Sequence, residues 1–256
     1  MNTAFARPLS YLYRRGRQNV IEQVYEKQYE EGRARDLEEV VEIGDKKLKA
    51  LPQFLTSFPI PKDIGVQFHD LYFPFPLTLA AFKDDLEIIE IWMRLGLGGA
   101  CIKTVMKEPR EGNPRPRLQE VTVNIDESCL LNAMGLPGQG VEGKIEELEQ
   151  AKMFRHGRPL GISIGGSSVE EYKEVFDKLN AYLQNVEDRD YGLQVWFEIL
   201  QQRPRPAMSQ QQPTLPIRPP LPYYFEVNIS CPNTPEGQQM SKHPELLEEL
   251  VKYMRT

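Results

Sequence analysis

The sequence has few of the residues that build disulfide frameworks and metal sites. Its 256 residues include only three cysteines and three histidines. The cysteines, Cys101, Cys129 and Cys231, are odd in number, widely separated and without the spacing of metal ligands. The sequence therefore predicts neither a disulfide framework nor a metal site. Free thiols are typical of a reducing compartment, so we expect a cytoplasmic protein.

Long hydrophobic runs and an excess of positive charge are also lacking. No uninterrupted apolar run approaches the roughly 20 residues of a membrane span, and the N-terminus has no hydrophobic signal core. Lysine and arginine total 31 against 37 aspartates and glutamates, a formal charge of -6 that argues against a general nucleic-acid binder. We expect no nucleic-acid partner and no membrane span. The hydrophobic content of 40% is ordinary for a soluble protein with a sizeable core.

The first 60 residues differ from the rest in their charge. From Arg14 to Lys49, nine acidic side chains are balanced by nine basic ones. Thin apolar stripes, such as the one at Val20, Ile21 and Val24, interrupt the charges. This pattern predicts one or two solvent-exposed helices packed on a larger body. We therefore expect residues 1–60 to form a charged helical N-terminal extension, with a membrane-surface or partner-binding helix as the minority interpretation.

From residue 76 the sequence alternates between strand-like and helix-like segments. We expect strands at 77–82, 99–104, 160–166 and 225–230, and helices at 85–95, 141–153, 167–183 and 244–254. Four β-α units in series predict parallel strands with right-handed crossovers. The uninterrupted apolar strands predict a sheet covered on both faces. The expected fold class is α/β, with residues 61–256 forming one partial β/α barrel domain.

One long segment interrupts this spacing. Residues 203–222 hold seven prolines and three consecutive glutamines. Proline removes backbone donors, so the segment cannot form a helix or a central strand. We expect a Pro/Gln-rich insertion at about 185–222, and a disordered loop is favoured over a functional one.

The strand-like run at 223–227 leads directly into a cluster of polar side chains. Residues 228–233 read Asn-Ile-Ser-Cys-Pro-Asn. Strand ends of this kind deliver reactive groups to the C-terminal edge of a barrel or an α/β sheet. Cys231 could act there as a base or a nucleophile, and Asn228 and Asn233 could each offer a donor and an acceptor to a planar polar ligand. Taken alone, Cys231 is better explained as a small buried hydrophobe.

Two further segments carry chemistry. Lys103 and Thr104 end the second expected strand, and residues 110–117 follow as Arg-Glu-Gly-Asn-Pro-Arg-Pro-Arg. Residues 131–138 read Leu-Asn-Ala-Met-Gly-Leu-Pro-Gly, in which the glycines allow close backbone approach and Asn132 can hydrogen-bond a flat amide. A strand-end lysine can neutralise a carboxylate or a reduced flavin. Separately, a surface charge and a simple turn explain these segments as well.

Taken together and in this order, the motifs resemble the dihydroorotate dehydrogenases. The resemblance covers about residues 76–254 and is absent from residues 1–60 and from the proline-rich insertion. It implies a (β/α)8 TIM-type barrel that carries FMN at its C-terminal mouth and oxidises dihydroorotate to orotate in pyrimidine biosynthesis. Class 1 enzymes of the family are soluble and use a cysteine base, whereas membrane-associated class 2 enzymes use serine. Cys231 therefore places the sequence nearer class 1.

The resemblance also implies roles for individual residues. Cys231 would be the catalytic base, and Lys103 would contact both the substrate carboxylate and the flavin. The remaining substrate-binding residues would be Asn132, Met134, Gly135, Leu136, Asn228 and Asn233. The remaining residues lining FMN would be Ala80, Ala81, Thr104 and Ser163. Because a cysteine of ordinary pKa, about 8.5, is mostly protonated at neutral pH, activity should rise toward alkaline pH.

Two departures from the family pattern stand out. Phe82 follows the Ala80-Ala81 pair where the family has a small residue. The family's last four β-α units, which supply a second flavin lysine and the phosphate cradle, have no counterpart in the sequence. Since four strands cannot close an eight-stranded barrel, we expect the N-terminal half of a barrel, about four β-α units, which needs a complementing C-terminal half or a homo-oligomer.

Two other functions fit the sequence. One is an inactive truncated paralogue that acts as an interaction protein through its insertion and charged helices. The other is a related pyrimidine-reducing flavoenzyme module, such as that of dihydropyrimidine dehydrogenase, which typically has histidine where Asn233 stands. The sequence does not distinguish fumarate, NAD and quinone as the electron acceptor.

Overall fold

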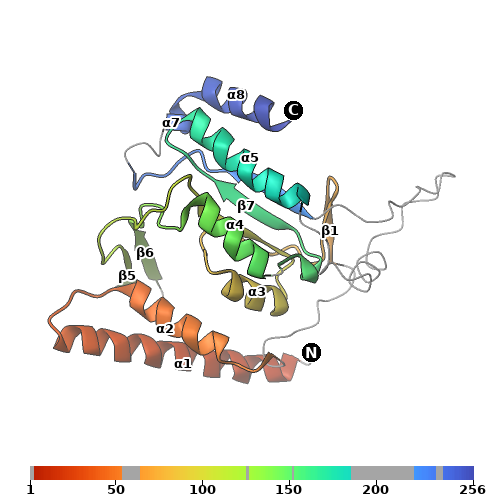
Figure 1. The fold of residues 1–256 in the computed structure, drawn as a ribbon. Coiled ribbons are helices and arrows are strands. Elements are labelled where there is room, and N and C mark those ends of the chain that lie inside the picture. The colour runs from red at the N-terminus through yellow and green to blue at the C-terminus, as the bar shows by residue number, and fades with distance from the viewer. Residues whose placement is uncertain (1–2, 54–63, 125–126, 152, 186–221, 235–238) are drawn as a thin grey trace. The chain divides into compact units, whose positions relative to one another are not determined.

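The structure, a computed structural model, describes residues 3–53, 64–124, 127–151, 153–185, 222–234 and 239–256. Its contacts divide the chain into two compact units. The helix–hairpin unit comprises Met1–Leu51 and Gly112–Gly135, and the sheet unit comprises Pro52–Glu111 and Leu136–Thr256. The elements are labelled in Figure 1. The insertion predicted at 185–222 lies, apart from its two end residues, outside the described residues.

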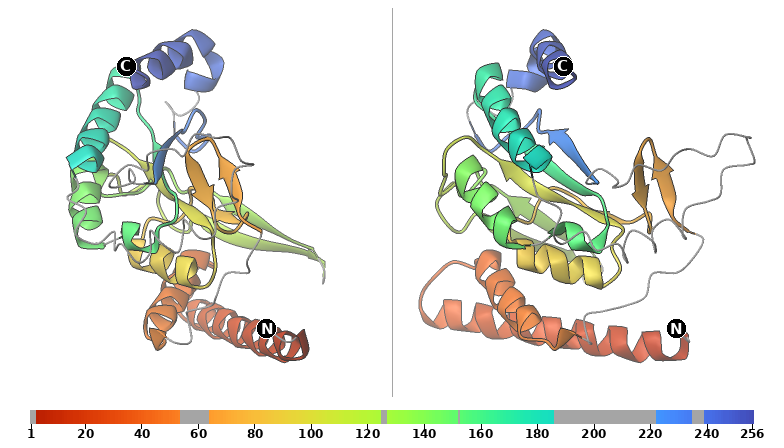
Figure 2. Two further views of the ribbon diagram at one scale, coloured as in Figure 1. Left: turned by 90° about the vertical axis from the view of Figure 1, so that its right-hand side faces the viewer. Right: turned by 45° about the vertical axis from the view of Figure 1, so that its right-hand side comes forward.

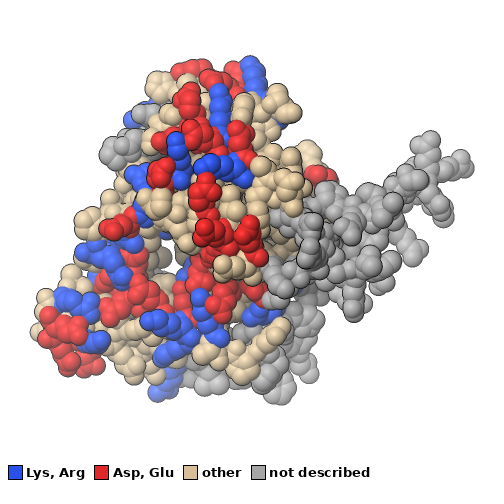
Figure 3. Space-filling model, in the orientation of Figure 1, with Lys and Arg blue, Asp and Glu red and all other residues tan. Residues whose placement is uncertain are grey.

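The helix–hairpin unit consists of two helices and an antiparallel hairpin. Helix α1 spans Thr3–Glu30 and α2 spans Leu37–Lys49, as the charge pattern predicted for this part of the chain. The side chain of Asp36 caps α2 by accepting a hydrogen bond from the backbone N–H of Glu38 at 3.0 Å. Strands β5 (Leu118–Asn124) and β6 (Glu127–Asn132) pair antiparallel. Figure 3 shows acidic and basic side chains lying side by side over the two helices.

The helix–hairpin unit has an apolar cluster of its own. Among the side chains that the structure describes, four are buried in it, Ile21, Val24, Leu37 and Val40. Leu118 of β5 packs against this cluster, together with partly buried residues of the two helices. The hairpin was not predicted, and its segment was assigned to the barrel domain. The boundary predicted at residue 60 falls among residues 54–63, outside the described residues, and stays a prediction.

The sheet unit is built on four parallel strands. Strands β3 (Thr78–Leu79), β4 (Gly99–Val105), β7 (Leu160–Ile164) and β8 (Tyr223–Val227) lie in the order β3-β4-β7-β8. The strands of this sheet therefore lie side by side in the same order as they occur in the sequence. This arrangement confirms the predicted α/β fold with a parallel sheet.

Helices follow the strands and cover one face of this sheet. They are α3 (Leu86–Arg94), α4 (Gly140–Ala151), α5 (Val169–Asn185), a short α7 (Gln239–Lys242) and α8 (Pro244–Met254), with a 3-10 turn at Met153–His156. Figure 2 shows α4 and α5 running along the same face. A separate antiparallel hairpin, β1 (Val66–Phe68) with β2 (Leu71–Phe73), precedes the sheet.

The two faces of the sheet carry different side chains. Alternate strand residues, including Ile102, Leu160 and Ile162, enter one apolar cluster with the helices. Intervening residues such as Cys101 and Gly161 belong to the other face, where an added Cβ on Gly161 would lie 2.4 Å from Cζ of Tyr224. Burial raises the pKa of the Cys101 thiol to about 12 and also raises the pKa of the Tyr224 hydroxyl.

The first predicted strand differs most from the structure. Residues 77–82 were expected to form a buried strand, but β3 has only two residues, of which Thr78 is exposed and Leu79 half-buried. Leu77 and Phe82 are 61% and 60% exposed. Within the described sheet, β3 pairs with β4 alone and lies at an edge. An edge position leaves one side of the strand without a neighbouring strand in the described sheet.

Candidate active site

The carboxyl ends of β4, β7 and β8 bring three polar side chains together. Thr104 Oγ1 lies 3.1 Å from Ser163 Oγ, and Asn228 Nδ2 donates to Thr104 Oγ1 at 2.8 Å. Thr104 is 7% exposed and Ser163 is fully buried. Parallel strands end at one edge of their sheet, so residues far apart in the sequence meet there. We call these three residues the strand-end row.

Asn228 is fixed by its backbone as well as by its side chain. Its backbone N–H donates to Ile164 O at 2.9 Å, which continues the β7–β8 ladder by one residue. The hydroxyl of Tyr172, on α5, donates to Asn228 O at 2.5 Å. Asn228 Oδ1 accepts from Ser230 N at 3.2 Å. These bonds set the direction in which the chain leaves β8 toward Cys231.

Cys231 lies in a small pocket beside this row. The thiol residue is 9% exposed. The pocket is lined by Met106, Arg110, Leu136, Gly165, Gly166, Ser167, Tyr172, Asn228, Cys231 and Thr234. Glycine is required at 166 because an added Cβ would lie 2.9 Å from the backbone nitrogen of Tyr172. A nearly buried thiol beside amide, hydroxyl and guanidinium groups can exchange a proton with a ligand that is shielded from water.

Most residues that line the pocket were not predicted as site residues, and Arg110 and Tyr172 are the two of these with the largest polar groups. Arg110 is held by paired backbone hydrogen bonds with Gly138, at 2.8 and 2.9 Å. Arg110 begins the loop motif at residues 110–117, so this motif could have indicated it as a site residue. Tyr172 gave no such signal, because its spacing from Val169 and Phe176 on α5 is that of an ordinary core residue. Burial raises the pKa of its phenol.

The remaining residues predicted to line the flavin lie around the ends of β3 and β4. Ala80 is exposed and Ala81 is half-buried, in a turn where Phe82 N donates to Ala80 O at 2.7 Å. Lys103 is half-buried, and its backbone N–H donates to Lys83 O at 3.0 Å. The Phe82 ring stacks on that of Trp92 in α3, with centroids 6.0 Å apart. Phe82 thus contacts its own β-α unit.

The predicted substrate residues divide between the two units. Leu136, which has a φ of 54°, lines the pocket of Cys231, and Asn233 is half-buried in the same sheet unit. Asn132, Met134 and Gly135 belong to the helix–hairpin unit, where Asn132 Oδ1 accepts from Met134 N at 2.9 Å. The structure therefore brings Cys231, Leu136 and the strand-end row together within one unit.

The strand-end groups suit a flat heteroaromatic cofactor such as a flavin. The Ser163 hydroxyl keeps hydrogen-bonding capacity beyond its contact with Thr104, whose oxygen also accepts from Asn228 Nδ2. Gly165 follows β7 directly, and an added Cβ would lie 2.8 Å from both Thr104 Cγ2 and Met106 Sδ, so glycine lets these side chains pack against the strand end. Small residues at a strand end allow a planar ring to approach the backbone closely.

Two kinds of feature are absent from the described part of the chain. Among the described residues, no helix is long and apolar enough to cross a membrane. The same part of the chain holds no group of three or more histidine, cysteine, aspartate or glutamate side chains placed to bind a metal ion.

Comparison with known proteins gives one consistent family. Residues 64–187 match the family model described as dihydroorotate dehydrogenase. A curated relative from Rhodopseudomonas palustris (strain BisB5) is 29% identical over 217 residues, which are 84% of this chain and 48% of the relative. A relative from Cyanothece sp. (strain PCC 7425) is 32% identical over 182 residues, 70% of this chain and 39% of the relative. Both are named dihydroorotate dehydrogenase (quinone).

Solved structures give the same result for the fold. The crystal structure of DHODH from Eimeria tenella in complex with ferulenol matches with a TM-score of 0.54 and 17% identity, over 84% of this chain and 50% of that chain. At this identity the match concerns the fold alone. The chain spans about half the length of the curated relatives it matches. The sequence comparisons support the dihydroorotate dehydrogenase family for this chain through residues 64–187, and its parallel sheet is similar to part of a dihydroorotate dehydrogenase barrel.

Proposed function

We propose that this chain takes part in the flavin-dependent oxidation of dihydroorotate to orotate in pyrimidine biosynthesis, with Cys231 as the catalytic base. The observation that carries the proposal is the placement of Cys231. Its thiol lies in a pocket that also contains Asn228, and Asn228 is bonded directly to the buried Thr104–Ser163 pair at the strand ends. A base, an amide and two hydroxyls thus lie within one structural unit.

Each residue has a role in this proposal. Cys231, as the thiolate, removes a proton from the substrate ring carbon next to the one that loses a hydride. Asn228 and Asn233 hydrogen-bond the amide and carbonyl groups of the ring. Lys103 balances the charge of the substrate carboxylate. Asn132, Met134 and Gly135 of the helix–hairpin unit, and Leu136, keep the recognition roles that the family resemblance implies.

FMN is the cofactor that this proposal requires. Ala80, Ala81, Lys103, Thr104 and Ser163 would hold it. When bound, FMN supplies the acceptor for the hydride that leaves the ring. The burial of Thr104 and Ser163 fixes their hydroxyl positions before any ligand arrives, which lowers the cost of ordering the site.

The described sheet does not close into a barrel. Its four strands leave β3 and β8 as edges within the described residues. Open parallel edges accept further strands, and an eight-stranded barrel needs four more. We therefore propose that residues beyond the described ones, in the same polypeptide, in a complementing one or in a second copy, complete the barrel wall.

The class of the enzyme is part of the proposal. A cysteine at position 231 favours the cytoplasmic class 1 type, whereas the matched relatives are named for quinone. Turnover with fumarate, NAD and a soluble quinone, measured in parallel, identifies the acceptor. Class 1 chemistry predicts turnover with fumarate or NAD, and activity with quinone alone contradicts that assignment.

The central experiment measures orotate formation by the protein purified together with a co-expressed C-terminal barrel half and supplied with FMN, dihydroorotate and each acceptor. Replacing a general base typically lowers the rate by roughly 100-fold or more, so Cys231→Ala should show at least that loss. Cys129→Ala is the matched control, because Cys129 is exposed on the hairpin and should leave the rate unchanged. Absence of orotate with all three acceptors contradicts the proposal. Oxidation of dihydrouracil in preference to dihydroorotate would instead support the sibling flavoenzyme.

A further inference from the structure

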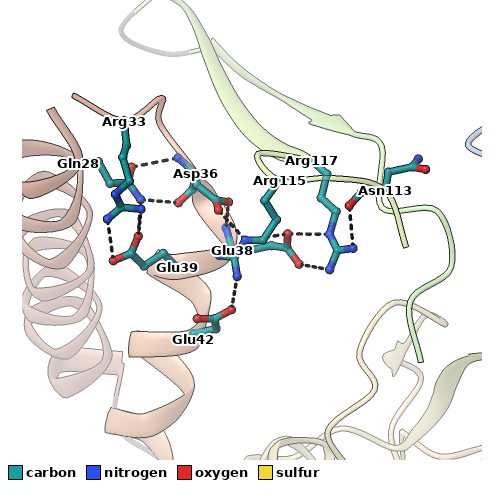
Figure 4. A network of polar contacts seen from close by, with 9 residues as sticks. All are labelled: Gln28, Arg33, Asp36, Glu38, Glu39, Glu42, Asn113, Arg115 and Arg117. Atoms are coloured by element: carbon teal, nitrogen blue, oxygen red, sulfur yellow. Dashed lines mark hydrogen bonds and ion pairs between the residues drawn. The ribbon is translucent and has the colours of Figure 1, made fainter. Parts of the chain in front are cut away.

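Within the helix–hairpin unit, one guanidinium joins helix α2 to the loop that precedes β5. Arg117 Nε and Nη2 donate to the two carboxylate oxygens of Glu38 at 2.8 and 3.0 Å. Its Nη1 donates to Asn113 O at 3.0 Å (Figure 4). The Arg117 and Glu38 side chains are only 12% and 13% exposed. Such a two-pronged bond fixes orientation as well as distance, and lysine cannot reproduce it.

Asn113 passes this constraint on to the segment after β6. Its backbone N–H donates to Met134 O at 3.0 Å, and its Nδ2 donates to Ala133 O at 2.9 Å. Ala133 N in turn donates to Arg117 O at 2.8 Å. The backbone of residues 133–134 is therefore bonded to both ends of the 113–117 loop. We call residues 132–135 the recognition loop, because the proposed function places substrate-binding groups there.

The end of the recognition loop is packed closely against the same asparagine. Gly135 has a φ of 73°, and an added Cβ would lie 2.8 Å from Asn113 Cγ. Only glycine combines this backbone conformation with such an approach. Asn132 Oδ1 accepts from Met134 N at 2.9 Å, so the direction of the Asn132 amide depends on where Met134 is held.

Arg115, which lies in the same 113–117 loop, provides a natural contrast. It donates to Asp36 Oδ2 at 2.6 Å and to Glu42 Oε1 at 2.8 Å, and it is 39% exposed. Its Nε also lies 3.5 Å from Glu38 Oε2, a longer ion pair than that of Arg117. Among the described residues, its hydrogen bonds reach α2 and do not extend to the recognition loop. Arg115 and Arg117 therefore bind the same acidic helix, but only Arg117 connects it to Asn113.

We propose that Glu38, Arg117 and Asn113 are positioning residues that hold the recognition loop in its substrate-binding conformation, so that helix α2 governs recognition of the pyrimidine ring. This inference rests on the proposed function for the role of Asn132. The coupling between α2 and the recognition loop is independent of the proposed function, because it consists of contacts that exist without substrate. Loss of the Glu38 carboxylate should therefore loosen the recognition loop even in the absence of substrate.

The test compares Arg117→Gln, Glu38→Gln and Arg117→Lys with the control Arg115→Gln. Amide hydrogen exchange is followed at Asn113, Ala133 and Met134, whose N–H groups make the loop bonds. Loss of one charge-assisted bond should raise their exchange rates by roughly tenfold in the two glutamine variants. The lysine variant should lie between these and the wild type. Arg115→Gln should leave the three amides unchanged.

The β5–β6 ladder separates positioning from general unfolding. Its amides should keep their protection in all variants, and a uniform loss across α2 and the hairpin overturns the proposal. Unchanged exchange at the three loop amides also overturns it, whatever the enzyme activity. In the active holoprotein, the KM for dihydroorotate should rise about tenfold with a smaller change in kcat. Faster loop exchange with an unchanged KM overturns the role in recognition while leaving the proposed reaction intact.

Discussion

The helix–hairpin unit and the sheet unit are stabilised by different forces. The sheet unit has a core in which strand residues such as Ile102, Leu160 and Ile162 are fully buried against helices. In the helix–hairpin unit the described side chains include four that are buried and apolar, and ion pairs link α2 to the loop at 113–117. The proposed base is thus mounted on an apolar scaffold, and the recognition loop on a charged one. The two units should respond differently to truncation, charge removal and acid.

The largest effect is expected from truncating the core of the sheet unit. Ile162 is fully buried between strands and helices. Ile162→Ala should lower the free energy of unfolding by about 2–5 kcal/mol through lost burial and a residual cavity. Urea denaturation followed by circular dichroism measures this change. The exposed Val41 of the other unit is the matched control, since Val41→Ala should change stability by less than about 0.5 kcal/mol. Equal losses in the two variants would contradict the comparison.

Charge removal should affect the helix–hairpin unit at an intermediate level. Glu38→Gln leaves the largely buried Arg117 guanidinium without its carboxylate partner. Hydrogen bonds to charged groups contribute about 1.5–3 kcal/mol, so a loss in this range is expected in the same urea experiment. Lys27→Gln breaks the exposed 3.8 Å pair with Glu31 and should cost less than about 0.5 kcal/mol. The account fails here if the two losses are indistinguishable.

Acid should produce the smallest effect, and again in the helix–hairpin unit. Hydrogen bonds from Arg33 and then Gln28 lower the pKa of Glu39 from its ordinary 4.5 to about 2. A depressed folded-state pKa stabilises the protein above the ordinary value, and this contribution is lost as the pH falls from about 4.5 toward 2. Because the pair is solvent-accessible, the effect is modest.

Amide hydrogen exchange of each unit, measured as the pH is lowered, tests whether acid affects the helix–hairpin unit before the sheet unit. Rates are corrected for the intrinsic pH dependence of exchange. The amides of α2 should lose protection before those of β7 do. Earlier loss of protection in β7 would show that the apolar unit is the more acid-sensitive one.

The sheet unit could be predicted from the sequence because its signals are local. Runs rich in β-branched residues marked β4 and β7, and the helix predicted at 244–254 coincides with α8. Proline at the first turn of α8 and the apolar stripe behind it were sufficient. The prediction of a buried strand at 77–82 was wrong. The apolar run at these positions does not reveal that β3 has a neighbouring strand on one side only in the described sheet.

The helix–hairpin unit was only half predictable. Its helices follow from composition, but the β5–β6 hairpin exposes Val121, Leu130 and Leu131, so it lacks the clean alternation of a half-buried strand. Its grouping with α2 depends on Arg115 and Arg117 reaching carboxylates more than 70 residues away in the sequence. Ion pairs between separated loops leave no periodic signal.

The strand-end position of Asn228 and Cys231 marked them as candidates, and the family resemblance added Thr104 and Ser163 and assigned the roles. The structure brings these four residues to one strand edge. Their roles stay predictions. Tyr172, which fixes the backbone of Asn228, occupies a core position of α5, and the sequence does not separate its hydroxyl contact from ordinary packing.

Differential alkylation of the three cysteines tests the proposed site most directly. Cys129 is exposed and should react first with iodoacetamide, whereas Cys101 is 2% exposed with a pKa raised to about 12 and should react last. Mass spectrometry gives the three rates with and without orotate. Orotate at ten times its dissociation constant should slow the labelling of Cys231 by about tenfold and leave Cys129 unaffected. An unchanged Cys231 rate at the highest soluble orotate concentration would contradict the account.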